Sequence, residues 1–463
     1  MASEIIRKTG IYLLGNAGSK LLGIVLIPIY SFFVPPAELG TFDFVVTIAG
    51  LAAIVYFVAV WESIIRFAMA REDARDADEV IRSSIIVGLG ASLALGVTAG
   101  VVLLAIGGHV EEVITGALIA ALTGIVKVWQ YAARAKRQSK LFAISGLVQA
   151  VINLAFVAIL ICVLRWGLTG LLVSYIAGLL AALVLLEVRV GLLRLRGWKW
   201  PPRSLISTIL RFTFPLMLNL ITIGLLEGYG RILITATLGP EANGQFAFAM
   251  RIALAVTMLG QVLSMASIEE TVLRIGTPSL APFYSTLLTS AWTLMLAGGA
   301  LTVVAAQVLY TFLDSTAYAG SLVLVPALVL WGALSVMATT YGNAFQVAQK
   351  TAVIAWTTFA GLIVSVGISL LTVWQFGTLG VALSMALGMM VTVSIRRLFA
   401  AGYVRFSEGR SALIAGAIFV FAAFWSIYPL PVVWKVIGMA GAAAAGVIVC
   451  LLALRDLNRA PNV

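Results

Sequence analysis

The sequence predicts an all-α polytopic membrane protein with about fourteen transmembrane helices, arranged as two six-helix repeats around a central cavity with two further C-terminal helices. Three observations lead to this fold class: an apolar composition, evenly spaced apolar runs and an internal repeat. The 463-residue chain is 62% hydrophobic, only 11% charged, and has a mean hydropathy of +1.08. Lipid must therefore cover most of its surface, which excludes a cytosolic enzyme, a secreted protein and a disordered tail.

Apolar runs long enough to cross a bilayer, about 20 residues each, follow one another along the whole chain. The polar stretches between them are too short to hold a kinase or glycosyltransferase domain. In order, the predicted spans lie near 10–33, 42–66, 83–106, 113–133, 141–164, 168–188, 212–235, 245–268, 282–312, 321–347, 351–374, 378–397, 411–428 and 434–454.

The positive charges fall mainly on one side of these spans. With the N-terminus placed in the cytoplasm, cytoplasmic segments hold 24 of the 30 Lys and Arg, while Arg165 and Lys435 lie outside and four lie within spans. This asymmetry is the positive-inside rule, and it predicts that both termini are cytoplasmic. It also accounts for most of the net charge of +11 without a nucleic-acid partner.

The two halves of the chain share aligned motifs. PPAELGTF at 35–42 aligns with GPEANGQF at 239–246 at an offset of 204, and 166–178 aligns with 376–388 at an offset of 210. Each repeat then has six spans of the same orientation, as in secondary transporters. The predicted parts are an N-terminal bundle at 1–190, a cytoplasmic linker at 191–211, a second bundle at 212–400, and two extra helices with a short tail at 401–463.

Cationic side chains at membrane depth are the first candidate site residues. Lys20 lies near the middle of the first span with Asn16 one turn before it, Lys127 lies in the fourth span, and Arg231 and Arg251 lie in the seventh and eighth at similar expected depth. Buried charges of this kind usually face a wet cavity, and together they suggest binding of a phosphate or pyrophosphate group. For Lys127 the alternative is that it extends to the cytoplasmic interface.

Acidic side chains form a second group, with an expected role in ion coupling or charge tuning. Glu227 precedes Arg231 by four residues, and Glu62 precedes Arg66 by the same spacing, so both could instead be structural intrahelical pairs. Asp43 completes the group near a span end.

Neutral polar residues in the spans are further candidates, since they could meet sugar hydroxyls. Those chosen for testing are Gln130 with Tyr131, and Asn343 with Tyr341.

Metal and cofactor chemistry is not expected. The single histidine, His109, lies in a short loop, and Cys162 and Cys450 lie inside apolar runs. This set lacks the spacing of a metal or disulfide framework. The sequence also lacks the GxxxxGK[ST] phosphate-binding loop that hydrolysis-driven transport would use.

An ordered set of segments makes the chain resemble a known family. The segments are PIYSFFVPPAELGTFDF, WESIIRFAMA, FPLMLNLITIGLLEGYGRILITATLGPEANGQFAFAMRI, NAFQVAQKTAVIAW and FGTLGVALSMALG. Together they resemble the polysaccharide transporters, or Wzx-type O-antigen flippases. These belong to the multidrug/oligosaccharidyl-lipid/polysaccharide exporter superfamily, which also includes the lipid II flippases.

The resemblance implies a flippase rather than an enzyme. Such a protein moves undecaprenyl-pyrophosphate-linked oligosaccharide across the bacterial plasma (inner) membrane by alternating access, for O-antigen, capsule or exopolysaccharide synthesis. Expected partners are this polyprenyl-linked substrate, membrane lipids, a coupling proton or sodium ion, and the polysaccharide polymerase machinery.

Three alternatives stay open: a lipid II-type flippase, an ion-coupled multidrug exporter, and a membrane enzyme such as a polymerase. The excess of Lys and Arg in the spans argues against export of cationic drugs, and the short outer loops argue against an enzyme.

Overall fold

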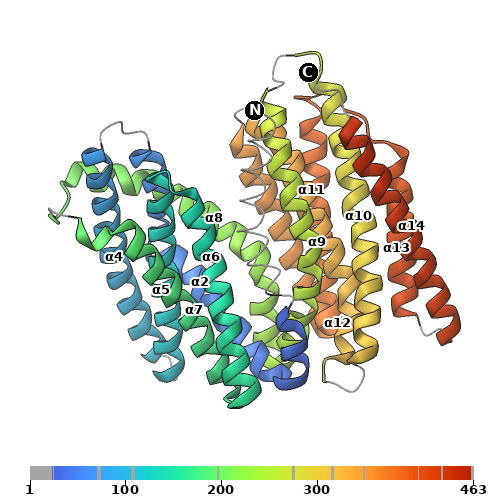
Figure 1. Cartoon of the computed structure of the whole chain (residues 1–463), viewed down its shortest axis with the longest axis horizontal. Coiled ribbons are helices and arrows are strands. Elements are labelled where there is room, and N and C mark those ends of the chain that lie inside the picture. Colours follow the sequence, from blue (N-terminus) through green and yellow to red (C-terminus); the bar gives the residue numbers. More distant parts are fainter. Residues whose placement is uncertain are drawn as a thin grey trace. The chain divides into compact units, whose positions relative to one another are not determined.

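The computed structural model describes residues 23, 25–69, 74–105, 110–195, 198–273, 277–313, 317–347, 350–404, 406–428 and 431–459. In these ranges every regular element is helical, with α-helices joined by short π-helical and 3-10 turns (Figure 1). Eleven of the helices are long and apolar enough to cross a membrane. The predicted all-α, multi-pass fold is therefore confirmed.

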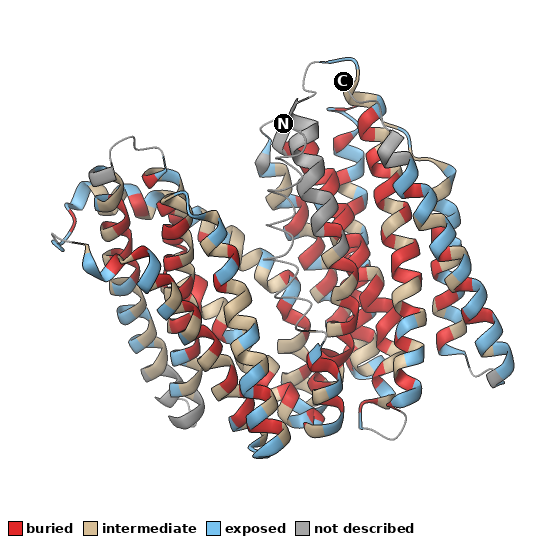
Figure 2. Cartoon of the chain, in the orientation of Figure 1, coloured by how far each residue is buried: buried red, intermediate tan, exposed pale blue. Residues whose placement is uncertain are grey.

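The chain forms two compact units. The first contains Met1–Val34 and Thr41–Gly228, and the second contains Pro35–Gly40 and Tyr229–Val463. Buried side chains fill the inside of each unit, while pale exposed residues cover its outer helix faces (Figure 2). Exposed apolar side chains on such faces are what a lipid-facing surface requires.

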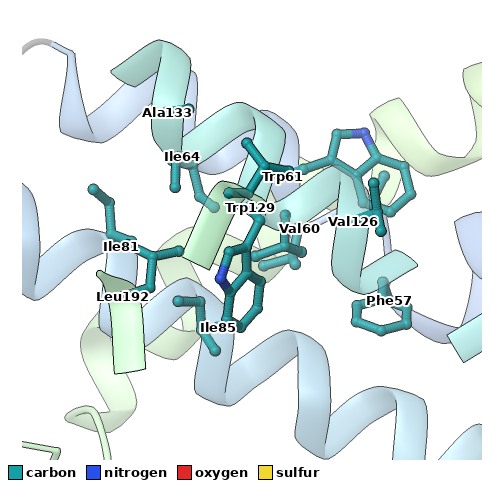
Figure 3. Packing of buried hydrophobic residues seen from close by; sticks show 14 of the residues in the cluster. Phe57, Val60, Trp61, Ile64, Ile81, Ile85, Val126, Trp129, Ala133 and Leu192 are labelled. Atoms are coloured by element: carbon teal, nitrogen blue, oxygen red, sulfur yellow. The ribbon is translucent and has the colours of Figure 1, made fainter. Parts of the chain in front are cut away.

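The first unit is built on helices from the first half of the chain. Its hydrophobic core gathers around Trp61, Trp129 and Phe57 (Figure 3). Its elements are α2 (Pro36–Tyr56), α3 (Trp61–Ser63), the π-helical turn η1 (Ile64–Ala68), α4 (Ala74–Ala105), α5 (Val110–Ala135), α6 (Ser139–Val157), the π-helical turn η2 (Ala158–Val163), α7 (Gly167–Val190), the 3-10 turn η3 (Leu192–Arg194) and most of α8 (Arg203–Leu238).

Most of the second unit follows Tyr229, which lies within the last third of α8. The C-terminal helices α13 and α14 pack against α10 and against each other. Its elements are α9 (Pro240–Leu273), α10 (Leu280–Phe312), the 3-10 turn η4 (Ala319–Leu324), α11 (Val325–Val347), α12 (Thr351–Ala400), α13 (Arg410–Ile427) and α14 (Val432–Arg459).

The predicted spans map onto these helices with two local differences. Spans 351–374 and 378–397 form the two arms of α12, which bends at Gly377, a residue with φ of 57° and ψ of −139°. The predicted span at 42–66 is interrupted, because α2 ends at Tyr56 and a turn precedes α3. The first span at 10–33 lies mostly outside the described residues.

The aligned motifs at 166–178 and 376–388 adopt the same local structure. Gly167 has φ of 55° and Gly377 has φ of 57°, a left-handed conformation that favours glycine. A second glycine follows each of them three residues later, Gly170 and Gly380, and its carbonyl accepts a serine hydroxyl. The Ser174 hydroxyl donates to the Gly170 carbonyl at 2.6 Å, and the Ser384 hydroxyl donates to the Gly380 carbonyl at 2.6 Å. The internal repeat is thus expressed in backbone geometry.

The other aligned pair of motifs meets inside the second unit. A Cβ on Gly40 would lie 1.8 Å from the Pro240 carbonyl oxygen, and a Cβ on Gly244 would lie 1.8 Å from the Pro36 oxygen. The buried Asn243 side-chain amide also donates to the Gly40 carbonyl at 2.8 Å. The first turns of α2 and α9 therefore cross so closely that both aligned positions require glycine.

Candidate functional site

The structure brings two predicted site residues together in the first unit. Lys127 on α5 places its Nζ atom 5.0 Å from the centroid of the buried Trp61 ring, and the Glu62 carboxylate attracts the same ammonium group. The Tyr131 hydroxyl, one turn further along α5, interacts electrostatically with the same carboxylate. A cation, an anion and two aromatic side chains therefore form one cluster, called here the Lys127 cluster.

The helix is interrupted at residues 57–60, between α2 and α3, and this interruption is called here the break. It positions Trp61 and Glu62 for the Lys127 cluster. Val58 and Ala59 have φ of 49° and 48°, so two consecutive non-glycine residues are left-handed. Each such residue costs about 1–3 kcal/mol and persists only where surrounding contacts impose it. The chain then enters α3 and the π-helical turn η1, where the Arg66 side chain is exposed. Broken helices at membrane depth are typical of substrate and ion sites in transporters.

Two glycines on neighbouring helices make room for the break. A Cβ on Gly124 of α5 would lie 2.2 Å from the Phe57 ring, and one on Gly88 of α4 would lie 2.6 Å from a Val60 methyl group. Figure 3 shows Phe57, Val60 and Trp61 packed together with side chains of α5. The break therefore rests directly on the backbones of α4 and α5.

Further polar side chains extend the Lys127 cluster along α5. The Arg134 guanidinium lies 5.4 Å from the Tyr131 ring centroid and 5.2 Å from that of Phe142. Gln130 donates to the Ser145 hydroxyl at 3.1 Å, so its amide also links α5 to α6. Lysine and arginine can bind phosphate oxygens, and aromatic faces and amides suit sugars, so this strip of α5 has the chemistry for an anionic glycolipid.

The remaining predicted residues lie elsewhere. Asn16 and Lys20 fall outside the described residues. Asp43 on α2 is half-buried and Glu227 on α8 is exposed, both in the first unit. Each of these two carboxylates takes part in at least one further interaction.

Arg231 and Arg251 belong to the second unit, where both are half-buried and engaged in interactions. The turn between their helices is tighter than expected, since α8 ends at Leu238 and α9 begins at Pro240. At about 1.5 Å per residue, Arg231 lies about 10 Å before the end of α8 and Arg251 about 16 Å after the start of α9. Arg251 therefore lies further along its helix from the turn than Arg231 does, and their similar depth in the membrane stays a prediction.

Arg396 is a buried cation at the end of the predicted span 378–397. Only 6% of it is exposed, and its guanidinium donates to the Ala338 carbonyl at 2.7 Å and to the Thr357 and Thr358 hydroxyls at 2.9 and 2.8 Å. A further hydrogen bond reaches the Ile354 carbonyl at 3.1 Å. These neutral partners join α11 to both arms of α12. The sequence signal was present, since the predicted span 378–397 already included this residue.

Tyr341, a candidate for contact with sugar hydroxyls, forms hydrogen bonds that link neighbouring segments of the second unit. Its hydroxyl donates to Glu408, which also accepts from Arg397 Nε at 2.9 Å, and Trp292 Nε1 donates to the Tyr341 oxygen at 3.1 Å. The neighbouring candidate Asn343 is buried. This network attaches the segment before α13 to α10, α11 and α12.

The comparisons with known proteins agree with this architecture. A family model described as "Polysaccharide biosynthesis protein" matches residues 5–268, which is more than half of the chain. A search of curated proteins gives no match.

Several solved structures share the fold at low sequence identity. The lipid II flippase MurJ in an inward closed conformation is 12% identical, with a TM-score of 0.71 and coverage of 97% of this chain and 99% of that chain. An inward-facing multidrug resistance MATE family transporter of the MOP superfamily is 19% identical, with a TM-score of 0.61 and coverage of 83% and 94%.

A third structure is a MOP superfamily transporter from Pyrococcus furiosus, described by a binding pocket of reverse polarity. It is 20% identical, with a TM-score of 0.58 and coverage of 86% and 94%. The matched fold, the apolar helices and the family model agree. The chain therefore belongs to the polysaccharide biosynthesis protein family and is a multi-pass membrane protein with the fold of MOP-superfamily transporters.

Proposed function

We propose that this protein is a flippase, and not an enzyme, that moves undecaprenyl-pyrophosphate-linked oligosaccharide across the bacterial plasma membrane for cell-surface polysaccharide synthesis. Its transport would proceed by alternating access, with both termini in the cytoplasm. Membership of the polysaccharide biosynthesis protein family and the MOP-superfamily fold support a transport role in this pathway.

The Lys127 cluster is the observation that carries the proposal. An ionisable group at membrane depth is costly, and it commonly marks a substrate pathway. The Lys127 ammonium group lies 5.0 Å from the Trp61 ring centroid and is attracted by the Glu62 carboxylate. An incoming pyrophosphate would compete with Glu62 for the ammonium group, because both are anions. Tyr131 and Gln130 stand beside it on α5, where they can contact the first sugars.

The other predicted residues have proposed roles of their own. Asn16 and Lys20, and separately Arg231 and Arg251 of the second unit, would each contact the anionic head during transport. Glu62, with Asp43 and Glu227, would balance these charges or exchange a coupling proton or sodium ion.

A lipid II-type flippase is the second candidate, and one observation favours it. The match to MurJ covers 97% of this chain and so extends over α13 and α14, whereas the matches to MATE transporters cover 83–86%. Export of cationic drugs remains a third possibility within the superfamily. The positive side chains of the proposed site make it a weaker one.

Reconstituted vesicles provide the test. The purified protein is incorporated into liposomes with fluorescent undecaprenyl-pyrophosphate-linked oligosaccharide, and the fraction of lipid that reaches the opposite leaflet is measured. We expect Lys127→Gln to slow flipping at least about tenfold, as loss of a charged hydrogen-bonding partner would, and Lys127→Arg to retain most of it.

The matched control is Lys140→Gln, which removes an exposed positive charge shortly after the same helix. Flipping by Lys127→Gln at the wild-type rate would contradict the site. Wild-type protein that exports cationic dyes but leaves the labelled lipid in place would contradict the function itself.

A further inference from the structure

The connection between α7 and α8, residues 191–203, carries an unusual concentration of positive charge. Six Lys or Arg lie between Glu187 and Glu227, and no acidic residue lies between those two. These cations are Arg189, Arg194, Arg196, Lys199, Arg203 and Arg211. We call residues 191–203 the basic connection; its residues 196 and 197 lie outside the described ranges.

Large apolar side chains of the basic connection are exposed beside these cations. Leu193 is 66% exposed, Trp198 is 40% exposed and Trp200 is 73% exposed. Arg194, Lys199 and Arg203 are exposed in the same stretch. Figure 2 shows the described residues of this stretch as a largely exposed segment before α8. A surface that combines aromatic rings with cations matches the headgroup level of a membrane, where Trp and basic side chains are enriched.

The basic connection is held in place by its own contacts. Gly191 caps α7 with φ of 66°, and its amide donates to the Glu187 carbonyl at 2.8 Å. The Glu187 carboxylate accepts from Trp129 Nε1 at 2.8 Å and from the Leu193 amide at 3.1 Å. The carboxylate nearest in sequence is thus engaged by an indole and a backbone amide, and the cations of the connection indicate an anion supplied from outside.

The position of Trp200 indicates a membrane rather than a soluble partner. A Cβ built on Gly90 of α4 would lie 3.8 Å from the Trp200 ring. Gly90 lies within the candidate membrane span Asp76–Gly100. The exposed ring therefore lies beside a helix that is able to cross the membrane, while Lys199 and Arg203 flank it in sequence.

We propose that the basic connection binds the headgroups of anionic phospholipids, in the cytoplasmic leaflet expected from the charge distribution. The cations would contact lipid phosphates, and Trp198 and Trp200 would lie among the glycerol and headgroup atoms. Because α8 begins at Arg203 and contributes residues to both units, bound lipid would hold the start of this 36-residue helix at the membrane surface. This interaction is independent of the transported substrate.

Native mass spectrometry of the full chain tests the proposal. The protein is released from nanodiscs of phosphatidylcholine with an increasing fraction of phosphatidylglycerol, and the retained phosphatidylglycerol is counted. We expect Arg194→Gln/Lys199→Gln/Arg203→Gln to weaken its retention at least about tenfold, given the attraction of each cation to an anionic surface. We expect Trp200→Ala, which keeps every charge, to weaken retention several-fold.

The matched control is Arg137→Gln/Lys140→Gln/Arg410→Gln, which removes three exposed cations outside the connection. It should retain phosphatidylglycerol as the wild type does. Equal losses in both triple variants would reduce the effect to net charge and overturn the proposal. Displacement of the lipid by inorganic phosphate would overturn it as well, by assigning the site to a soluble anion. If the triple variant does not fold, Trp200→Ala decides alone, and wild-type retention by it counts against the proposal.

Discussion

Both units use glycine to bring helix backbones together, and the first unit also uses it for a second purpose. In the second unit, Gly361 and Gly388 bring the two arms of α12 together, since a Cβ on either would lie 2.8 or 2.6 Å from the other's carbonyl oxygen. In the first unit, a Cβ on Gly178, which aligns with Gly388, would lie 2.7 Å from the Gln149 carbonyl oxygen, whereas Gly124 faces the Phe57 ring. The backbone contacts fix two helices against each other, whereas the contact at Gly124 accommodates a bent and strained segment.

The polar groups beside Gly388 and Gly124 differ as well. In the second unit, the buried Tyr229 hydroxyl bonds to Ser365 at 2.7 Å and to Ser369 at 3.1 Å, a neutral network between helices. In the first unit, a broken helix places Glu62 near Lys127. Neutral, fully paired contacts favour one arrangement, while a charge pair on a strained turn can be exchanged for a ligand. We infer that the first unit contains the element that responds to substrate.

The largest expected effect is on the helix contact of the second unit. Gly388→Ala would place a methyl group 2.5 Å from Ser365 Cβ and 2.6 Å from the Gly361 oxygen. Neither atom can move without moving a helix, so we expect a loss of about 3 kcal/mol or more in stability. Thermal unfolding followed by size-exclusion chromatography measures it. Gly367→Ala, on the same helix with open space around it, should melt as the wild type does.

A smaller loss of stability but a clear loss of transport is expected at Gly124. Gly124→Ala would push the Phe57 ring and shift the break, and we expect a cost of about 1–3 kcal/mol with flipping slowed several-fold per folded molecule. Phe57→Leu should restore part of the rate by removing the obstructing ring. Gly116→Ala, on the same helix and facing open space, is the control. Full activity of Gly124→Ala would show that the break is not needed for transport.

Relief of strain should have a moderate effect of opposite sign. Val58→Gly removes the penalty of a left-handed β-branched residue, so we expect a gain of up to about 1 kcal/mol in stability. If the break must hold Glu62 near Lys127, the same variant should not flip lipid faster. A variant that is less stable than the wild type would show that the Val58 side chain contributes more by packing than it costs in strain.

A loss of stability of comparable size, without a loss of transport, is expected in the neutral network. Tyr229→Phe removes two hydrogen bonds between helices, and such bonds are worth about 0.6 kcal/mol each in a membrane protein. We expect a small drop in melting temperature and wild-type flipping. A transport defect here would place part of the substrate response in the second unit and weaken the distinction between the units.

The sequence predicts the fold well because the physical constraints are local. An apolar run of bilayer length needs no partner to be recognised, and the paired glycines Gly167 and Gly377 mark the same left-handed turn in both repeats. The break at residues 57–60 could not be predicted in this way. Its sequence, Phe-Val-Ala-Val, contains neither glycine nor proline, and the turn is imposed by space above Gly88 and Gly124 on other helices.

The candidate site was only partly predictable for the same reason. Lys127 and Glu62 could be chosen one by one as charges within spans, but their proximity depends on how α3 meets α5. The expected partner of Glu62 was Arg66, four residues on, yet a π-helical turn begins at Ile64 and changes that spacing. Arg396 shows that a cation at the end of a predicted span can be buried when neighbouring helix turns supply carbonyl and hydroxyl groups.

Binding of undecaprenyl pyrophosphate to wild type, Lys127→Gln and Glu62→Gln is the most direct test of the Lys127 cluster. If the pyrophosphate replaces Glu62 as the partner of Lys127, Lys127→Gln should bind at least about tenfold more weakly. Glu62→Gln should bind more tightly than wild type, because the ammonium group is then no longer neutralised. Unchanged affinity in Lys127→Gln, or weaker binding by Glu62→Gln, would contradict the proposed exchange of partners.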